Sequence, residues 1–208
     1  MNTIDRLASL FSKFPGIGLR QAHRFVYFLL SAQKDFLPEL ISLLASLKAK
    51  VRECASCYRF FEGTTKENIC SLCAESDKKP LLIIVEKDVD LENIRKSKIE
   101  NSAYFVLGGL HSPFAQDSSA VKGSSARMQK LIARVKTDIE NKTLQEIILA
   151  FGAESHGDYT ALHIKKILTQ LVAQNNIKIT TLGRGMSTGT EIEYSDAETL
   201  KNAFDNRR

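Results

Sequence analysis

The sequence has no long apolar stretch, no cysteine outside one short segment and no internal repeat. Its longest apolar run, Phe25–Leu30, is far shorter than the roughly 20 residues that a membrane-spanning helix needs. The N-terminus reads Met-Asn-Thr-Ile-Asp-Arg, without the basic region and apolar core of a secretory signal. These absences predict a globular, cytoplasmic protein that does not associate with membranes.

Charge is distributed unevenly along the 208 residues, which carry a formal net charge of +5. The segment up to Glu53 has eight Lys and Arg against four Asp and Glu, whereas the remainder has 21 against 20. A locally basic segment attracts polyanions. The first quarter of the chain is therefore the expected contact for a nucleic acid.

All four cysteines lie in two Cys-x-x-Cys pairs, Cys54/Cys57 and Cys70/Cys73. Each pair forms a tight knuckle, and the loop between them returns the second knuckle to the first, so that four thiolates can surround one ion. Tetrahedral sulfur ligation suits zinc, and four protein ligands leave no position for a substrate, so we expect one structural zinc ion per chain. The alternatives are four unrelated buried thiols or two disulfides, which are unstable in a reducing cytosol. Because such a knuckle has almost no apolar core, metal binding is expected to supply most of its folding free energy.

Apolar residues at helical spacing predict two amphipathic helices, within 4–11 and 22–30. The segment Phe14–Arg20 between them is too rich in helix breakers to be helical and too short for anything but a tight hairpin. A helix that begins just after two glycines presents free backbone N–H groups to a phosphate, and nearby cations add to the attraction. We therefore predict sequence-independent binding to the DNA backbone, the alternative being a plain helix connection that needs glycines; the candidate residues are Lys13, Gly16, Gly18, Arg20 and Arg24.

The remaining periodic segments predict one more helix and then an α/β region. Leu40, Leu44, Leu47 and Val51 are spaced as in a helix, and we interpret them as packing residues. Helical spacing recurs within 128–135 and 164–171, whereas 116–125 is of low complexity and is expected to be an exposed loop. Short β-prone runs separated by longer polar or helical stretches predict a mainly parallel sheet with crossover helices; the runs are Leu81–Val85, Ala103–Leu107, Glu146–Phe151 and Lys178–Leu182.

Acidic residues follow two of these predicted strands, and function in parallel sheets gathers at the carboxyl ends of strands. The first strand ends at Glu86, with Asp88 and Asp90 close behind, and the third is followed by Glu154-Ser155-His156-Gly157-Asp158. This layout resembles the Toprim domain of topoisomerases, primases and some nucleases, in which acids hold magnesium for phosphoryl chemistry. Catalytic Toprim domains carry D-x-D where this chain has His156-Gly157-Asp158, so catalytic magnesium is not expected. A magnesium-dependent nuclease or topoisomerase-like enzyme is the alternative function, and a zinc-stabilised protein adaptor without DNA contact is a third.

The order of hairpin helices, four-cysteine zinc knuckle and degenerate Toprim domain resembles the RecR recombination-mediator proteins of bacteria. The resemblance covers nearly the whole chain and rests on these residues: Pro15–Gly18 with Ala22 and Arg24, the four cysteines, Val85-Glu86 with Asp90, Val106–Gly109 with Ser112-Pro113, and the closing motif Gly185, Gly189, Glu191–Tyr194, Asp196 and Thr199-Leu200. The chain departs from the family pattern at His156-Gly157-Asp158, Arg184, Ser187 and the stretch Phe114–Ser125.

The resemblance implies an α+β protein of several parts and no enzymatic activity. It would comprise a helix-hairpin-helix region for DNA binding and assembly (1–53), a four-cysteine zinc finger (54–73), an α/β Toprim domain (80–176) and a C-terminal arm with a strand and a helix (177–208). Such chains form homo-oligomers, either dimers or a ring of four around duplex DNA, and act with RecO-like and RecF-like partners in recombinational DNA repair. In that case Arg20 and Arg24 would touch phosphates, and the Toprim acids Glu86, Asp90 and Asp158 would face protein partners.

Overall fold

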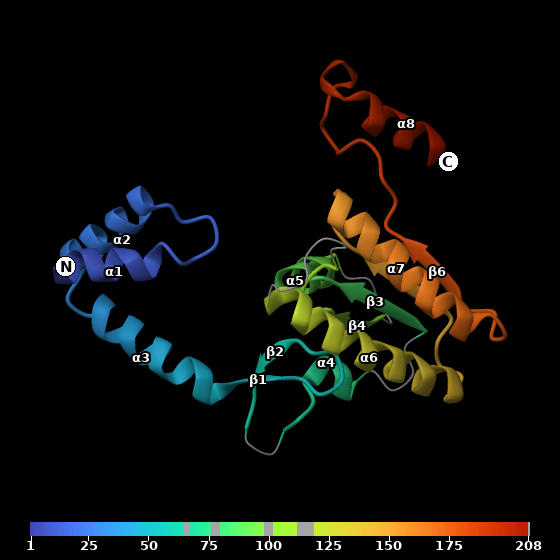
Figure 1. Cartoon of the computed structure of the whole chain (residues 1–208), viewed down its shortest axis with the longest axis horizontal. Coiled ribbons are helices and arrows are strands. Elements are labelled where there is room, and N and C mark those ends of the chain that lie inside the picture. The colour runs from blue at the N-terminus through green and yellow to red at the C-terminus, as the bar shows by residue number, and fades with distance from the viewer. Residues whose placement is uncertain (65–66, 76–79, 98–101, 112–118, 208) are drawn as a thin grey trace. The chain divides into compact units, whose positions relative to one another are not determined.

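The computed structural model describes residues 1–64, 67–75, 80–97, 102–111 and 119–207, with only the backbone of 119–125. Its helices and strands follow one another as drawn in Figure 1, and the chain divides into two compact units, Met1–Val51 and Arg52–Arg208. In the described part of the chain, no helix is both long and apolar enough to span a bilayer.

The first unit consists of three helices, α1 (Thr3–Phe11), α2 (Leu19–Ser31) and α3 (Phe36–Lys50). Helices α1 and α2 form the predicted hairpin, and a small core holds them together, with Ala8, Ala22 and Val26 at its centre. Helix α3 has the predicted periodicity but buries none of its residues, and Leu44 is 59% exposed. The expectation that α3 packs through its leucines is therefore wrong within this unit, because periodicity reveals an apolar face but not what covers it.

The second unit contains a four-stranded parallel sheet in the order β4-β3-β5-β6. The strands are β3 (Leu81–Val85), β4 (Ser102–Val106), β5 (Glu146–Ala150) and β6 (Lys178–Thr181). All residues of β3 from Leu82 on are buried, and so are all residues of β4. Continuous burial of this kind is typical of a parallel sheet covered on both faces. The predicted parallel sheet is confirmed, each strand lying within one residue of its predicted run.

Helices cover both faces of this sheet. Leu82 and Ile84 point to one face, where they pack against α6 (Ser119–Glu140) and α7 (Ser155–Val172), which Figure 1 shows side by side. Ile83 and Val85 point to the other face, against α5 (Asp88–Lys96) and Leu72. Because α5 leads from β3 to β4 and α7 leads from β5 to β6 on the opposite face, the chain reverses its direction across the sheet between β3 and β5. This is a topological switch point, where the carboxyl ends of strands leave a crevice.

The backbone of residues 119–125 belongs to α6, so this part of the predicted loop 116–125 is wrong, while 116–118 lie outside the described residues. Serine and alanine tolerate helical backbone, and a helix nucleated by the amphipathic segment 128–135 extends at little cost per residue. The Ser112-Pro113 motif also lies outside the described residues. The chain closes with a 3-10 turn, η1 (Ile192–Tyr194), and α8 (Ala197–Asp205), which Asp196 caps through the backbone N–H of Thr199 at 2.9 Å.

Candidate metal centre and nucleic-acid interface

The four cysteines come together at the start of the second unit. Cys54 follows the short strand β1 (Val51–Glu53), Cys57 lies in the turn before β2 (Phe60–Glu62), and the other two lie at α4 (Ser71–Ala74). All four side chains are buried, and their sulfur atoms lie within 4.8 Å of one another. The spacing of the two Cys-x-x-Cys pairs therefore brings four sulfurs to one point, as predicted.

The geometry of this cluster fits a tetrahedrally bound metal ion. Zinc–sulfur bonds of about 2.3 Å in a tetrahedron place neighbouring sulfurs about 3.8 Å apart. The Sγ atoms of Cys57 and Cys70 are 3.7 Å apart. In addition, the backbone N–H of Cys70 donates to Sγ of Cys54 at 3.4 Å, which is the hydrogen bond that a thiolate ligand accepts. The four cysteines are thus positioned to hold a metal ion.

The thiols of the cluster have unequal pKa values. A hydrogen bond from Cys57 lowers the pKa of Cys73 to about 5, and the same bond, together with burial, raises the pKa of Cys57. Burial raises the pKa of Cys70 to about 11. A divalent cation bound among these sulfurs would supply the charge that lets all four ionise.

The cysteine module, residues 52–74, is attached to the edge of the parallel sheet. Its Cys57 carbonyl accepts the backbone N–H of Val106 at 2.8 Å, so the module covers part of the exposed edge of β4. The ring of Tyr58 packs on Phe105, with centroids 5.2 Å apart. The module thus gains stability from the sheet as well as from its metal ligands, an attachment that the spacing of the cysteines does not reveal.

The hairpin of the first unit presents an open helix end. Gly16 has φ +77°, a left-handed conformation that favours glycine, and the chain then enters α2 with Gly18 as its N-cap. The N-cap contributes no side-chain hydrogen bond. The first helical bond runs from the N–H of Ala22 to the carbonyl of Gly18 at 3.0 Å, so the preceding N–H groups point out of the helix end.

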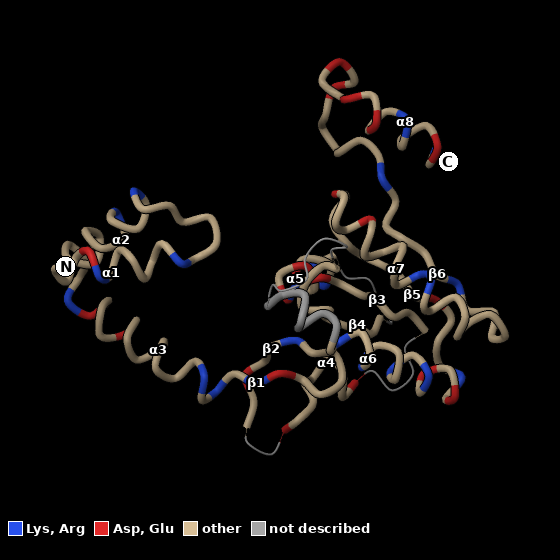
Figure 2. The backbone as a smooth tube through the Cα atoms, in the orientation of Figure 1, with Lys and Arg blue, Asp and Glu red and all other residues tan. Residues whose placement is uncertain are grey.

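The five predicted DNA-binding residues, Lys13, Gly16, Gly18, Arg20 and Arg24, are all exposed around this helix end. Arg24 donates to Oε1 of Gln21 at 3.1 Å, which holds its guanidinium toward the first turn of α2. A Cβ atom added at Gly18 would meet nothing within 4 Å, so packing inside the chain does not require glycine there. Figure 2 shows that α1 and α2 carry more basic than acidic residues.

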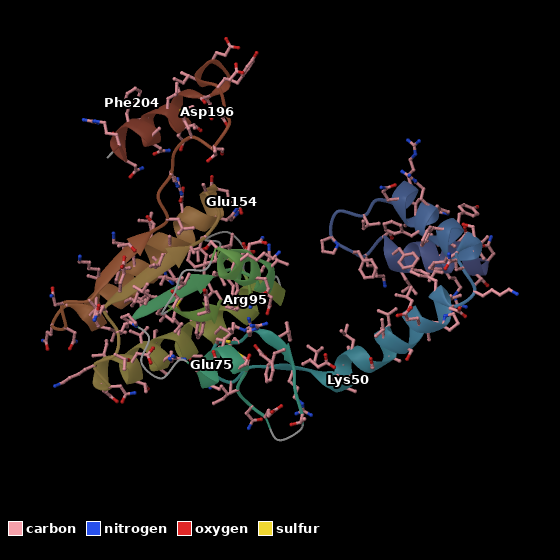
Figure 3. The ribbon with its side chains drawn as sticks, turned by 180° about the vertical axis from the view of Figure 1, so that it is seen from behind. Lys50, Glu75, Arg95, Glu154, Asp196 and Phe204 are labelled. Atoms are coloured by element: carbon pink, nitrogen blue, oxygen red, sulfur yellow. The ribbon has the colours of Figure 1, made fainter. Side chains whose placement is uncertain are left out.

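The three predicted Toprim acids all have partners within the chain. Glu86 lies 2.7 Å from Nζ of Lys87, and Asp90 accepts the Lys87 backbone N–H at 3.0 Å, which caps α5. Asp158, on the first turn of α7, pairs with Arg184. The carboxylate of Glu86 raises the pKa of Lys87, with smaller contributions from Asp90 and from Glu154, which Figure 3 labels just before α7. Lys87 is thus the cation beside Glu86, and Arg184 is the cation paired with Asp158.

Among the described residues, the four cysteines form a group close enough to share one metal ion, and the Toprim acids do not. Beside Asp158, a groove of about 750 Å³ runs from the ends of β5 and β6 to α8. The pair Asp158–Arg184 lies in its wall, as do Lys165, Asn202 and Asn206. The side-chain amide of Asn206 donates to the Arg184 carbonyl at 2.9 Å, which ties α8 to this edge.

Two residues that shape the Toprim edge were not identified as structural determinants from sequence. A Cβ atom at Gly157 would lie 2.1 Å from the carbonyl oxygen of Gly152, so only glycine allows α7 to begin so close to the turn after β5. Thr160 is fully buried, and its hydroxyl accepts the backbone N–H of His111 at 2.9 Å, which joins α7 to the segment after β4. No local pattern signals either role, because each depends on a segment distant in sequence or on backbone approach.

The parallel sheet and the acids at its switch point are those of a Toprim domain, and a comparison with known families agrees: residues 81–183 match the Toprim domain. Residues 185–208 match the C-terminal region of RecR. A recombination protein RecR from Bifidobacterium adolescentis is 33% identical over 99% of this chain and 95% of its own length. RecR proteins from Brachyspira hyodysenteriae and Chloroherpeton thalassium are 32% and 31% identical, over 96% and 99% of this chain and 93% and 96% of their own lengths.

The chain therefore belongs to the RecR family of recombination proteins, as the sequence motifs predict. These relatives are named for recombination and not for an enzymatic reaction, which agrees with the prediction of a non-enzymatic protein and does not favour the nuclease or topoisomerase-like alternative. The predicted Toprim domain and four-cysteine cluster are confirmed together. A role in recombinational DNA repair follows from this membership.

Proposed function

We propose that this protein is a recombination mediator that binds DNA without sequence preference, forms a ring-like clamp from several copies and acts with RecO-like and RecF-like partners. The observation that carries the proposal is the open, basic start of α2. Backbone N–H groups point out of this helix end, and the side chains of Lys13, Arg20 and Arg24, which are close to it in sequence, are exposed. Such a site binds a phosphate and reads no bases, because its donors match the backbone that all sequences share.

A single hairpin of this kind offers few phosphate contacts, so useful affinity requires several copies on one DNA molecule. The exposed apolar side chains of α3 support assembly of such copies. Ile41, Leu43 and Leu47 are each more than half exposed. A group of exposed apolar side chains on one helix is typical of a surface that binds another protein chain. In the proposed dimer or ring of four, a second copy of the chain would cover these side chains of α3.

The ion in the cysteine cluster is zinc in this proposal, one per chain and structural. The four sulfurs, Cys54, Cys57, Cys70 and Cys73, are soft ligands in tetrahedral spacing, and they leave no open coordination position for a substrate. Zinc would therefore hold the module in shape against β4 and take no part in a reaction.

The acids Glu86, Asp90 and Asp158 form the proposed contact for protein partners. Glu86 and Asp90 follow β3, and Asp158 follows β5 and borders the groove together with Arg184. Their ionic partners Lys87 and Arg184 are partly exposed, so a basic partner surface could exchange with these cations at small cost. We assign the four parts of the chain as 1–53 for DNA binding and assembly, 54–73 for zinc, 80–176 for the Toprim domain and 177–208 for the arm.

The test is a salt titration of DNA binding with two matched double variants. Arg20→Ala/Arg24→Ala removes two charges at the start of α2, whereas Lys48→Ala/Lys50→Ala removes two exposed charges at the end of α3. Each lost phosphate contact lowers the slope of log affinity against log salt by about 0.9 for duplex DNA. Fluorescence anisotropy on one labelled duplex should therefore show a shallower slope and weaker binding for the arginine variant only.

Light scattering and metal analysis of the same samples separate DNA contact from folding. Zinc content should be equal in the parent and both variants, because neither pair of residues lies at the cysteines. Solution mass should also be equal, because the proposed assembly contact uses the apolar side chains of α3 and not its lysines. If the arginine variant binds as tightly as the parent, with the same salt slope, the hairpin is not the DNA contact. A single-chain mass at all concentrations, with and without DNA, would exclude the clamp.

A further inference from the structure

The cysteine module, residues 52–74, also contacts helix α5, which follows β3 and its acid Glu86. The backbone N–H of Phe60, in β2, donates to a carboxylate oxygen of Asp88 at 2.7 Å. Asp88 is the first residue of α5, so the module holds the helix at its start. A hydrogen bond to an ionised group is stronger than one between neutral groups, and this one joins positions that lie 28 apart in sequence.

A second polar contact lies one turn further along α5. The guanidinium of Arg59 is 2.9 Å from one carboxylate oxygen of Glu92, and only 19% of the arginine side chain is exposed. The other oxygen of Glu92 pairs with Arg95 of α5 itself, at 3.0 Å; Figure 3 labels Arg95. Glu92 is therefore held between one cation of the module and one of the helix, which fixes the direction of its carboxylate.

An apolar contact completes this attachment. Leu72, between Cys70 and Cys73, packs against the core on the sheet face that α5 covers, and also against the cysteine cluster. A metal ion bound by both cysteines would therefore hold Leu72 in place as well. Because the fold of so small a module depends on its metal, all three contacts to the α5 side of the sheet depend on the metal too.

We infer that the metal-bound cysteine module positions the proposed partner-binding acids at the end of β3, acting through Asp88 and Glu92 of α5. Asp90 caps α5 by accepting the backbone N–H of Lys87 at 3.0 Å, so a displaced helix start moves this carboxylate with it. Glu86 directly precedes the same turn. The inference rests on the metal centre and on the partner contact proposed above.

The link acts in both directions, because coupling between two sites is reciprocal. If the bound metal stabilises the docked start of α5, the docked helix stabilises the metal-bound module by the same factor. A hydrogen bond to a charged group changes an equilibrium constant by about tenfold or more. Loss of the polar contacts should therefore loosen the start of α5 and weaken metal binding by similar factors.

The test compares zinc-loaded and chelator-treated protein, under reducing conditions, by hydrogen exchange of the segment 86–92. In the parent, zinc removal should speed exchange of this segment about tenfold. Asp88→Ala/Arg59→Met removes both polar contacts, so its segment should already exchange about tenfold faster with zinc bound, and zinc removal should add little. Zinc release to a chromophoric chelator should also be about tenfold faster in this variant. Protection of β3 equal to that of the parent shows that the variant is folded.

The matched control is Asp88→Asn/Arg95→Met. Asparagine keeps an oxygen that accepts the Phe60 N–H, but it lacks the charge at the start of α5 just as alanine does. The second substitution removes a cation from Glu92 without touching the module. The control should match the parent in segment exchange and in zinc release, which separates the contacts to the module from the effect of charge on the helix.

Unchanged exchange of the segment 86–92 on zinc removal from the parent would overturn the inference. So would a zinc response of full size in Asp88→Ala/Arg59→Met, or a control that behaves as this variant does. A parent that binds no zinc would overturn the metal centre and this inference with it. The partner contact is tested separately, by binding of a RecO-like protein to Glu86→Gln/Asp90→Asn, and its failure would leave the exchange results as they are.

Discussion

The two units of this protein differ in how much of their apolar surface they bury. The second unit, Arg52–Arg208, has a continuous core on each face of its sheet, with Phe105, Leu82 and Ile84 fully buried. The first unit, Met1–Val51, buries Ala8, Ala22 and Val26 and leaves all of α3 without a buried residue. A core of three small side chains is little for a segment of this size, since domains of about 60 residues are already marginal.

This difference indicates that the two units are stabilised in different ways. The α/β unit has the apolar contacts to hold its shape by itself, and its cysteine module adds metal ligands at the sheet edge. The helical unit has exposed aromatic and aliphatic side chains, of which Phe28 is 56% exposed and Leu30 is 69% exposed. Assembly of several copies would therefore stabilise the helical unit far more than the α/β unit.

Removal of the metal should produce the largest effect, and it should be confined to one part of the α/β unit. In Cys70→Ser, the bound zinc falls from one ion per chain to none, because three thiolates leave the tetrahedron incomplete. Structural zinc contributes on the order of 10 to 16 kcal/mol of binding free energy in small modules, so residues 52–74 should lose their protection from amide exchange. Elemental analysis and hydrogen exchange measure both effects.

The sheet should survive in the same variant, since its two cores contain no cysteine. Protection of β3 and β5 equal to that of the parent is the expected result. Loss of protection throughout the α/β unit would show that the module and the sheet fold as one. A variant that keeps its zinc would remove Cys70 from the ligand set.

A matched pair of phenylalanine substitutions tests the comparison directly. Phe105→Ala empties a site that is 0% exposed and should cost about 3 to 5 kcal/mol of unfolding free energy. Phe28→Ala removes a ring that is 56% exposed, so its cost in a dilute, monomeric sample should be under about 1 kcal/mol. Urea unfolding at low protein concentration gives both values.

Protein concentration separates burial in the chain from burial in an assembly. The cost of Phe28→Ala should increase at concentrations where copies associate, whereas that of Phe105→Ala should not change. Equal costs for the two substitutions in the monomer would break the comparison, because the helical unit would then hold its apolar residues as firmly as the sheet does.

Most of the sheet could be predicted from sequence because each strand is an apolar run with clear borders. Leu81–Val85 is such a run, and the predicted range is the same as that of β3. The cysteine cluster could also be predicted from sequence, since two Cys-x-x-Cys pairs at this spacing are typical of a metal site. The open start of α2 was predictable because glycines and a proline interrupt two helical patterns at Pro15–Gly18.

The remaining features depend on contacts between segments distant in sequence. The periodicity of α3 does not say which surface covers its leucines. The contacts of Arg184 with Asp158 and of Arg134 with Ser56 join polar side chains that lie 26 and 78 positions apart. The sequence identified the acids Glu86, Asp90 and Asp158 as candidate site residues. It did not identify Lys87, because a single lysine near acids is common in solvated loops.

A pH effect of smaller size should also belong to the α/β unit. Burial lowers the pKa of His111, and the neighbouring His163 lowers it further through its positive charge. The two rings are 5.2 Å apart, and Tyr159 stacks on His163. Since the folded state holds His111 less protonated than the unfolded state, its contribution to stability is complete above about pH 6.5 and is lost as the pH falls below that value.

Urea unfolding of the parent and of His111→Gln between pH 5 and pH 8 checks this. The parent should lose unfolding free energy below about pH 6.5, and the variant, which cannot be protonated there, should lose less. His163→Gln removes the neighbouring charge but leaves His111 half-buried, so it should reduce the pH effect without abolishing it. A pH dependence that is identical in all three proteins, or that is lost in His163→Gln but kept in His111→Gln, would show that His111 is not its source.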